Sequence, residues 1–382
     1  MKSYPSDPHA IFDIVIAGGG LAGLSCAIHL SKIGFNILLI EQNIYPRHKV
    51  CGEYISNEVI PYLKFLGFDP LEAGAKNISK FELSSSGSKK VSCALPLGGF
   101  GISRYTIDHA LAKLATAHGT KIIHDQVSTI DFADDEFSIA TKKGISHRSK
   151  LVIGAFGKRS SLDVNLQRSF IQEKSPYLAV KIHARGEFPA DVVALHNFKG
   201  GYCGVSKIEN DHINLCYIAS YDKFKKYKNI EDFQQKVVFR NKYLHKIFSQ
   251  SKSVFSKPLT ISQISFSSKA PVEQHIIMCG DTAGMIHPLC GNGMSMAIRS
   301  AQIASALIIK FLNREISRDT MEKSYIYEWE KEFKQRLRFG HLVAYLFRKT
   351  SIIELSMPLL KLFPGLLPKV VRFSHGNPMN II

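Results

Sequence analysis

Three glycines near the start of the chain have the spacing of a dinucleotide site. Gly18, Gly20 and Gly23 form the pattern G-x-G-x-x-G directly after the apolar run at residues 14–17. The run predicts a strand buried on both faces, and the apolar residues after Gly23 recur at helical spacing. In such a turn the first glycine allows the tight bend, the second lets the backbone approach a pyrophosphate, and the third lets the helix pack on the strand.

An acidic residue completes this pattern. A second apolar run, "FNILLIEQ", predicts another buried strand and ends at Glu41. This is about 20 residues beyond the glycines, where a carboxylate can accept hydrogen bonds from ribose hydroxyls. The helix N-terminus also offers free N–H groups to phosphates. The residues predicted to contact a dinucleotide here are Gly18, Gly20, Leu21, Ala22, Gly23, Glu41 and Gln42.

A second glycine-rich segment occurs late in the chain. "CGDTAGMIHPLCGNGMSMAIRSA", residues 279–301, follows a short apolar run and leads into a predicted helix at residues 295–309. Two such glycine-rich segments indicate that one long cofactor is held at two places far apart in the sequence. The Asp281 carboxylate can accept from a polyol chain, and the N–H groups at the helix start favour an electron-rich ring. We therefore expect FAD rather than NAD. The late contacts predicted are Gly280, Asp281, Gly291, Asn292, Gly293 and Met294.

The late segment resembles the G-D-x-A-G-x-x-x-P-x-x-G-x-G turn of the geranylgeranyl reductase-like flavoproteins. These belong to the larger p-hydroxybenzoate hydroxylase-type superfamily of FAD enzymes. "YPRHKVCGEYIS", residues 45–56, and "SRYTIDHALAKLA", residues 103–115, resemble two further segments of that family. The matches run in the family's order from about residue 12 to residue 310.

The resemblance implies roles for further residues. Arg47 and Arg104 would lie along the pyrophosphate and ribityl chain, where guanidinium groups bind phosphate oxygens in bidentate fashion. Val127 would offer its backbone to the adenine, and Pro288 would border the flavin ring. In this chain Phe156 stands where the superfamily usually has the Asp of "GADG". The resemblance leaves NAD(P)H open as electron donor, and Phe156 argues against a close nicotinamide contact.

Two residues are candidates for a part in the chemistry, although the catalytic residues are unknown at this stage. Cys51 would lie near the flavin beside the substrate in the resembling family, with a buried small apolar residue as the alternative. Tyr202 remains from the family's Y-x-W-x-F-P pocket motif, whose Trp and Phe-Pro are missing here. Flavin chemistry needs no protein nucleophile, since the protein supplies position, electrostatics and shielding. No metal site is predicted.

The element pattern predicts an α/β fold with an α+β second domain. We expect a Rossmann-like FAD-binding domain, an antiparallel-sheet substrate domain and a C-terminal helical tail. The ranges predicted are 10–165 with 270–315 for the FAD-binding domain, 76–100 with 166–269 for the substrate domain, and 316–382 for the tail. "FELSSSGSKKVSCALPL" predicts a hairpin that turns at Gly87, and residues 230–248 predict a basic helical stretch.

The composition and charge of the chain limit the kinds of partner and the cellular location that we expect. The chain of 382 residues has a net charge of +17, but no zinc-finger spacing or RNP-like run, so no nucleic-acid partner is expected. Seven scattered cysteines without a C-x-x-C pair favour reduced thiols and a cytoplasmic location. Residues 1–10 lack a signal-peptide pattern, and no run of 18 apolar residues appears.

The tail has a different character from the rest of the chain. "RLRFGHLVAYLFRK" and "SMPLLKLFPGLLPKVVRF" combine apolar runs with seven basic residues. They predict either a helical cap packed on the FAD-binding domain, or a functional role. That role would be peripheral contact with a membrane surface, on the inner face, or an entrance for an apolar substrate.

Four functions compete at this point. We expect an FAD-dependent oxidoreductase that transfers hydride between flavin and a small apolar, isoprenoid- or polyketide-like substrate. The alternative is an FAD-dependent aromatic monooxygenase. A halogenase is disfavoured, because halogenases of this class carry a W-x-W-x-I-P motif and Trp329 is the one tryptophan here. A flavin-binding module without chemistry would be supported by Phe156 alone.

Overall fold

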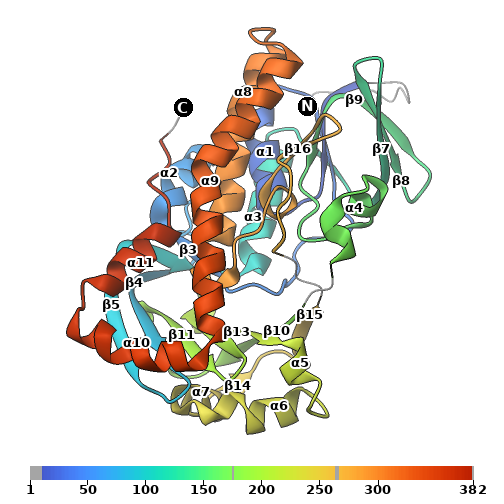
Figure 1. The fold of residues 1–382 in the computed structure, drawn as a ribbon. Coiled ribbons are helices and arrows are strands. Elements are labelled where there is room, and N and C mark those ends of the chain that lie inside the picture. Colours follow the sequence, from blue (N-terminus) through green and yellow to red (C-terminus); the bar gives the residue numbers. More distant parts are fainter. Residues whose placement is uncertain (1–10, 174–175, 263–265, 381–382) are drawn as a thin grey trace.

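Two sheets form the body of the protein, and three C-terminal helices pack along one side (Figure 1). The computed structural model describes residues 11–173, 176–262 and 266–380, so the expectation about a signal pattern in residues 1–10 lies outside them. The α/β fold predicted from the sequence is confirmed, including the two different sheets and the helical tail. All seven cysteines are free.

The first sheet is mainly parallel and carries the early glycine turn. Its main strand order is β16-β17-β9-β1-β2-β6, and β7 and β8 extend it beside β9. The strands are β1 (Ile11–Ala17), β2 (Ile37–Ile40), β6 (Lys121–Ile123), β7 (Val127–Ala133), β8 (Glu136–Thr141), β9 (Ser146–Gly154), β16 (Val272–Glu273) and β17 (Ile276–Met278). Both glycine-rich turns follow parallel strands of this sheet, β1 and β17, which places the turns at the same edge.

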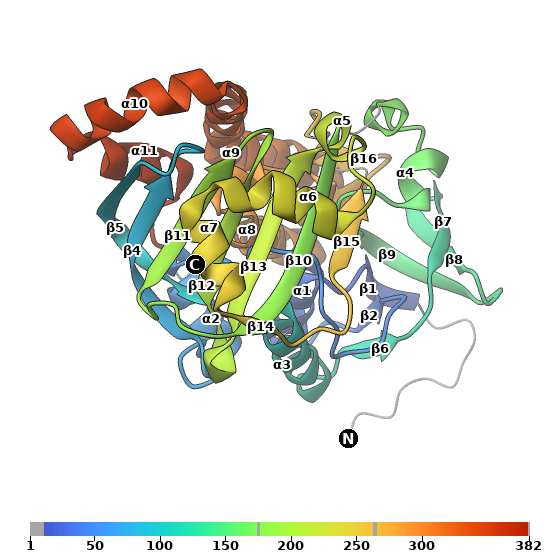
Figure 2. The same ribbon diagram turned by 90° about the horizontal axis from the view of Figure 1, so that it is seen from below.

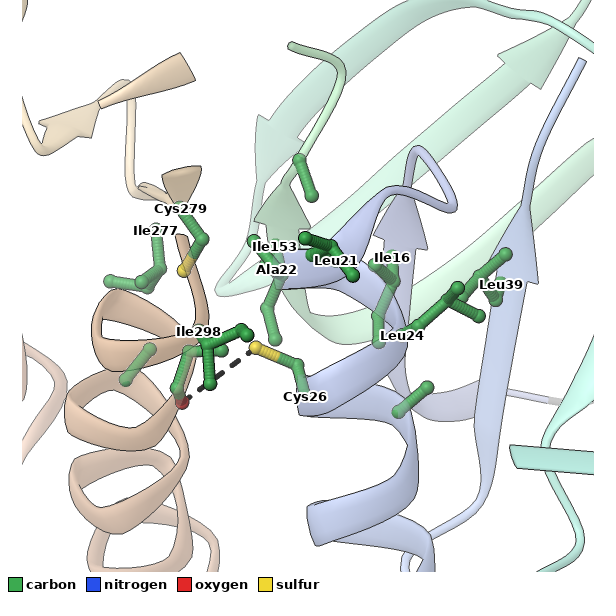
Figure 3. Packing of buried hydrophobic residues seen from close by; sticks show 14 of the residues in the cluster. Ile16, Leu21, Ala22, Leu24, Cys26, Leu39, Ile153, Ile277, Cys279 and Ile298 are labelled. Atoms are coloured by element: carbon green, nitrogen blue, oxygen red, sulfur yellow. Dashed lines mark hydrogen bonds between the residues drawn. The ribbon is translucent and has the colours of Figure 1, made fainter. Parts of the chain in front are cut away.

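Helices α1 (Leu21–Lys32) and α8 (Gly293–Leu312) pack against each other beside this sheet (Figure 3). Their contact is close, because small residues meet there and the Cys26 Sγ lies 3.8 Å from the Ala301 carbonyl oxygen. Leu24 and Ile298 are fully buried in the same cluster. The first and last parts of the nucleotide-binding unit therefore form one core. The neighbouring helices are α2 (Ile60–Leu66), α3 (Arg104–Ala117) and α4 (Ser161–Asn165).

The second sheet is largely antiparallel and has the strand order β14-β10-β13-β12-β11-β4-β5-β3, with β15 beside β10. Its strands are β3 (Tyr54–Ser56), β4 (Lys76–Ser84), β5 (Lys90–Gly101), β10 (Tyr177–Arg185), β11 (Val192–Phe198), β12 (Gly201–Lys207), β13 (Ile213–Ser220), β14 (Lys252–Ser253) and β15 (Leu259–Ser262). The predicted hairpin is confirmed, since β4 and β5 pair on either side of Gly87. Strand β3 pairs with β5, so residues 54–56 join this sheet although they lie in the predicted FAD-binding range.

Short helices cover the outer face of the second sheet (Figure 2). They are α5 (Tyr221–Phe224), α6 (Ile230–Lys236) and α7 (Lys242–Ser249). The basic helical stretch predicted at 230–248 is therefore helical, and it consists of two helices with a break between them. The break occurs because Asn241 is extended and caps α7, with its side chain accepting from the Tyr243 and Leu244 N–H groups.

The tail consists of α9 (Arg318–Arg348), α10 (Thr350–Leu362) and α11 (Leu366–Ser374). Helix α9 packs along α8, and its Tyr325 hydroxyl donates to the Met278 carbonyl oxygen at 2.6 Å. Tyr325 and Phe333 are fully buried, so the first half of α9 belongs to the core.

One helix in the described part of the chain has the length and composition of a membrane span. Helix α8 is long and apolar enough to cross a membrane, but 56% of that window is buried inside the protein, as in the core helix of a soluble protein. Helices α10 and α11 pass the same test only as a pair bent by 117°. Length and composition alone are thus weak evidence for a span.

Candidate functional site

A cavity of about 1280 Å³ connects the two sheets and the tail. Most of the residues predicted to hold the cofactor line it: Gly18, Gly20, Leu21, Ala22, Glu41, Gln42, Arg47, Arg104, Val127, Gly280, Asp281, Pro288, Gly291, Gly293 and Met294. Gly23 and Asn292 do not. Gly23 lies behind the turn, and the Asn292 side chain donates to the Ser374 carbonyl oxygen at 2.9 Å, which ties the late turn to α11.

Two helices begin at the cavity without a side-chain cap. Helix α1 starts after Gly20 and α8 after Asn292, and neither N-terminus receives a side-chain hydrogen bond. Ser103 caps α3 and Ser317 caps α9, whereas α2, α10 and α11 also lack a side-chain cap. Backbone N–H groups at a helix start need partners. At α1 and α8 these donors are left for a ligand, which fits a molecule with an anionic group at each of the two turns.

The three early glycines have different roles. A Cβ at Gly18 would lie 2.3 Å from the Ala155 carbonyl oxygen, and a Cβ at Gly23 would lie 2.0 Å from the Gly18 carbonyl oxygen. Those two positions need glycine for packing. A Cβ at Gly20 would meet nothing nearer than an Arg104 nitrogen at 3.8 Å. Gly20 therefore leaves space inside the cavity rather than inside the core.

Glu41 is held directly under the glycine turn. Its Oε2 accepts from the Gly19 N–H at 2.9 Å, and its Oε1 accepts from the Asn43 N–H and side chain at 3.0 Å. Burial favours the neutral acid, but these hydrogen bonds and nearby Lys49 keep the pKa of Glu41 below its usual value. The Tyr45 hydroxyl donates to the Gly19 carbonyl oxygen at 2.7 Å, a contact that the sequence analysis missed.

A buried ion cluster supports the predicted phosphate region. The Arg104 guanidinium donates twice to the Asp108 carboxylate, from Nε and Nη2, each at 2.7 Å. Lys49 Nζ contacts the same carboxylate at 2.8 Å. Burial opposes the charge of Asp108, but the two cations hold the pKa of this carboxyl low. Two cations share one carboxylate, so positive charge remains beside the uncapped start of α1, and Arg47 also lines the cavity there.

A second group of cations fixes the late turn. Lys269 Nζ donates to the carbonyl oxygens of Lys158 and Asp281 at 2.9 and 2.7 Å. Burial lowers the pKa of Lys269 to about 8. Arg168 donates to the Thr282 carbonyl oxygen at 3.0 Å and pairs with Asp163. The carbonyl groups of Asp281 and Thr282 thus accept hydrogen bonds from these two cations. The Asp281 residue also lines the cavity.

Cys51 lies on a loop that is fixed from the second sheet. Its Sγ is 3.5 Å from the Met294 Sδ, at the start of α8. Two residues further on, Glu53 is fully buried and binds Lys181 Nζ at 2.5 Å and His183 Nε2 at 2.6 Å. Burial opposes ionisation of Glu53, but Lys181 and His183 keep its pKa low. Lys181 and His183 lie on β10, so sequence spacing gave no sign that they meet this loop.

The far half of the cavity is apolar. It is lined by side chains of the second sheet and the tail, among them Leu83, Leu195, Ile218, Ile261, Phe347, Ile353, Leu360 and Leu367. Tyr202 on β12 lies here and is 8% exposed. Its hydroxyl has no hydrogen-bond partner among the residues that the structure describes. Trp329 lies elsewhere, with its ring packed at Gly284 behind the late turn.

Comparisons with known proteins match the part of the cavity that the early glycine turn forms. Residues 13–47 match the family model described as "FAD binding domain". The chain is 22% identical to Conditioned medium factor receptor 1 of Dictyostelium discoideum, over 93% of this chain and 74% of the relative. It is 22% identical to digeranylgeranylglycerophospholipid reductase of Methanococcus vannielii, over 90% of this chain and 87% of the relative. The solved structure of the flavin-dependent brominase Bmp2 has a TM-score of 0.78 at 19% identity, covering 97% of this chain and 95% of that one.

The protein is an FAD-dependent enzyme. The matched segment contains β1, the glycine turn, α1, β2 and Glu41, the same elements that the geometry places at one end of the cavity. The family model thus matches this flavoprotein at the early turn, and the prediction of FAD is confirmed. The individual contacts remain predictions. The resemblance to geranylgeranyl reductase-like proteins is supported at low identity, and the fold is shared with a flavin-dependent brominase.

Proposed function

We propose that this flavoprotein transfers hydride between FAD and an apolar, isoprenoid- or polyketide-like substrate. The observation that carries the proposal is the single cavity that runs from the two glycine turns to an apolar half. Its volume of about 1280 Å³ exceeds the roughly 300–1,000 Å³ of a pocket for one small ligand. The space therefore suits a cofactor and a substrate together.

Residues in one half of the cavity would bind the cofactor, and residues in the other half would enclose the substrate. Bound FAD would supply the hydride-transfer chemistry, and the uncapped starts of α1 and α8 would offer N–H donors to its pyrophosphate and its flavin ring. Arg104 and Lys49 supply positive charge near the early turn. The aliphatic side chains of the second sheet and the tail exclude water from the other half, which is the protein's main task in flavin chemistry.

Hydride transfer is preferred over hydroxylation or halogenation for chemical reasons. The apolar half offers mainly aliphatic wall, which matches a long aliphatic substrate better than a flat aromatic ring stacked between aromatic side chains. The relative from Methanococcus vannielii is named as a reductase of a lipid with isoprenoid chains. Phe156 lines the cavity in place of an acid, so electron supply need not depend on tight nicotinamide binding. A cytoplasmic location goes with this proposal.

Cys51 and Tyr202 have subordinate roles in this proposal. Cys51 lies 3.5 Å from Met294, so its sulfur is placed at the edge of the late turn, where it shapes the boundary between cofactor and substrate. Tyr202 presents a hydroxyl without a partner in an otherwise apolar wall. We infer that this hydroxyl meets a polar atom of the substrate, while the reacting bond lies among apolar side chains.

The test is a single-turnover experiment with the purified holoprotein. The flavin is reduced with dithionite without oxygen, and polyunsaturated isoprenoid lipids or polyketides are added one at a time. We expect flavin reoxidation and a product that has gained two hydrogen atoms. A product that appears only with oxygen and has gained one oxygen atom would establish the monooxygenase instead. A product that has gained a halogen atom, in the presence of oxygen and halide, would establish a halogenase.

A further inference from the structure

The last two helices have two different apolar faces. We call α10 and α11 together the lid, residues 350–374. On its inner side Ile353, Leu360, Leu367 and Val371 line the cavity. On its outer side the apolar residues recur at helical spacing: Ile352, Leu355, Leu359 and Leu362 on α10, and Leu366, Val370 and Phe373 on α11. A helix pair that only capped a soluble domain would need the inner face alone.

The outer face is unusually exposed for its composition. Leu355 is 80% exposed, Leu362 is 72% exposed and Phe373 is 69% exposed, and Phe363 between the two helices is also exposed. The lid projects from the body beside β5 in both views (Figures 1 and 2). Contiguous exposed apolar surface of this kind marks a contact with a partner or a membrane.

The charges around this face have one sign. Lys349, Lys361, Lys369 and Arg372 are exposed, and none forms an ion pair with a described side chain. The single acid within the lid is Glu354, and its carboxylate is occupied by the Gly87 N–H and the Ser86 hydroxyl on the β4–β5 turn. Earlier on α9, lysines pair with acids one turn away, as in Lys323 with Asp319 and Lys334 with Glu330. The lid therefore lacks the compensation found on the neighbouring surface.

The cavity reaches the surface at the edge of the lid. Leu342 on α9 and Val370 on α11 both line the cavity and are both exposed. Residues with both properties mark the mouth of a cavity. A mouth thus opens between α9 and α11, next to the outer apolar residues Leu366 and Phe373. Gln42 and Val164 also line the cavity and are exposed, so a second opening lies at the nucleotide end.

We propose that the outer face of the lid docks on an anionic lipid bilayer, so that the mouth of the cavity takes its apolar substrate from the acyl-chain layer. The choice of a bilayer follows from charge complementarity, since exposed apolar residues flanked by unpaired cations suit the interface of an anionic membrane. The net charge of +17 acts in the same direction. That the docked protein receives its substrate this way rests on the function proposed above.

The experiment is vesicle flotation with full-length holoprotein. Vesicles of phosphatidylcholine are compared with vesicles that also contain phosphatidylglycerol, at low and high salt. We expect binding to the anionic vesicles at low salt, and at least tenfold weaker binding to neutral vesicles or at high salt. The lid variant L355E/L362E changes two exposed side chains and should bind at least tenfold more weakly. Leu71→Glu places the same charge at an exposed leucine outside the lid and should bind like the unchanged protein.

Truncation of the tail is unsuitable for this test, because α9 contributes Tyr325 and Phe333 to the core. Equal binding by the lid variant and the Leu71 variant would overturn the proposal. So would size-exclusion data in which the unchanged protein is a dimer, L355E/L362E is a monomer, and vesicle binding is absent, because the face would then join two copies. Turnover of detergent-solubilised substrate separates the two proposals: loss of vesicle binding with intact turnover affects docking alone, whereas binding without turnover affects the proposed function alone.

Discussion

The two ends of the cavity differ in the protein groups that form their walls. At the nucleotide end, glycine turns at the starts of α1 and α8 bring backbone to the wall, beside the charged side chains of Glu41, Arg47 and Arg104. At the substrate end the walls are side chains from the second sheet and the lid. A backbone wall binds the same group in any protein that keeps the glycines, whereas a side-chain wall can change with each substitution. The glycine turns therefore indicate the cofactor, whereas the side chains of the substrate end indicate only a class of substrate.

Matched substitutions at two glycines, one at each end of the cavity, should give the largest difference in FAD binding. Gly20 and Gly204 both line the cavity, and a Cβ at either would have no neighbour closer than 3.7 Å. Gly20→Val should place a side chain where the pyrophosphate is expected and weaken FAD binding by about 3 kcal/mol or more, on the order of 100-fold. Gly204→Val should retain FAD and obstruct the substrate. Flavin absorbance after desalting and calorimetric titration with FAD measure the effect.

Circular dichroism provides the control for both glycine variants, since each should keep the fold. Gly23→Val is a different case, because its Cβ would lie 2.0 Å from the Gly18 carbonyl oxygen and should destabilise the domain itself. If Gly204→Val lost FAD as completely as Gly20→Val, the division into two ends would be wrong.

The local signals explain what the sequence predicted. Strand, glycine turn, helix and Glu41 follow one another within residues 11–41, and each depends on neighbours in sequence. Gly23 and Asn292 were assigned to the cofactor with the rest of their motifs, but motif membership does not tell which residue faces a ligand. Gly23 instead allows α1 to pack on the turn, and Asn292 binds the backbone of α11.

The long-range contacts could not be predicted in the same way. Glu53 meets Lys181 and His183 across about a third of the chain, and no periodicity links a loop after β2 to strand β10. The lid presents the same difficulty. Its helices were expected to cap the protein, to meet a membrane surface or to form an entrance for an apolar substrate, and the sequence did not show which of their faces lines the cavity. Such placements depend on tertiary packing, which the order of residues does not display.

The second sheet, which provides the wall of the substrate end, should lose stability in acid. His196 on β11 is buried, and its Nδ1 is hydrogen-bonded to the Ser84 hydroxyl at 2.8 Å. Burial lowers the pKa of His196 to about 4, so the folded state keeps it neutral while the unfolded state binds a proton below about pH 6.5. Stability should therefore fall as the pH drops from 6.5 to 4, by on the order of 3 kcal/mol from this group.

Urea unfolding at a series of pH values tests this prediction. The variant His196→Gln removes the titrating group, so its stability should depend less on pH over that range than that of the unchanged protein. His29 in α1 has a similarly low pKa of about 4 and is present in both proteins, so it cancels in the comparison. Parallel stability curves for the two proteins would contradict the assignment.

Asp281 should have a smaller effect, at the nucleotide end. It is the one carboxylate of the late turn, and Lys269 holds its backbone from behind. Asp281→Ala should weaken FAD binding by about 0.5–1.5 kcal/mol, since one hydrogen bond to a neutral polyol is lost while the backbone donors remain. Leu195→Ala, at the apolar end, should leave the FAD dissociation constant unchanged. Losses as large for Asp281→Ala as for Gly20→Val would show that side chains, not backbone, dominate this end.

The smallest expected effect concerns one oxygen atom at the apolar end. The Tyr202 hydroxyl is buried and lacks a partner among the described residues, and a buried unsatisfied hydroxyl costs about 1–3 kcal/mol. Tyr202→Phe should therefore fold at least as stably as the unchanged protein. If the hydroxyl binds a polar atom of the substrate, the variant should raise KM about 3- to 10-fold and leave kcat unaltered, because such a bond is equal in ground and transition states.

Tyr217→Phe is the matched control for this prediction. Tyr217 lies on the neighbouring strand β13, but it belongs to the cluster under α6, and its hydroxyl is bonded to Gln234 at 3.5 Å. Its removal should leave KM unchanged. A KM for Tyr202→Phe equal to that of the unchanged protein would mean that the substrate is apolar along this entire wall. In that case recognition at the substrate end would depend on shape and the exclusion of water, and the nucleotide end would hold all the polar contacts of the cavity.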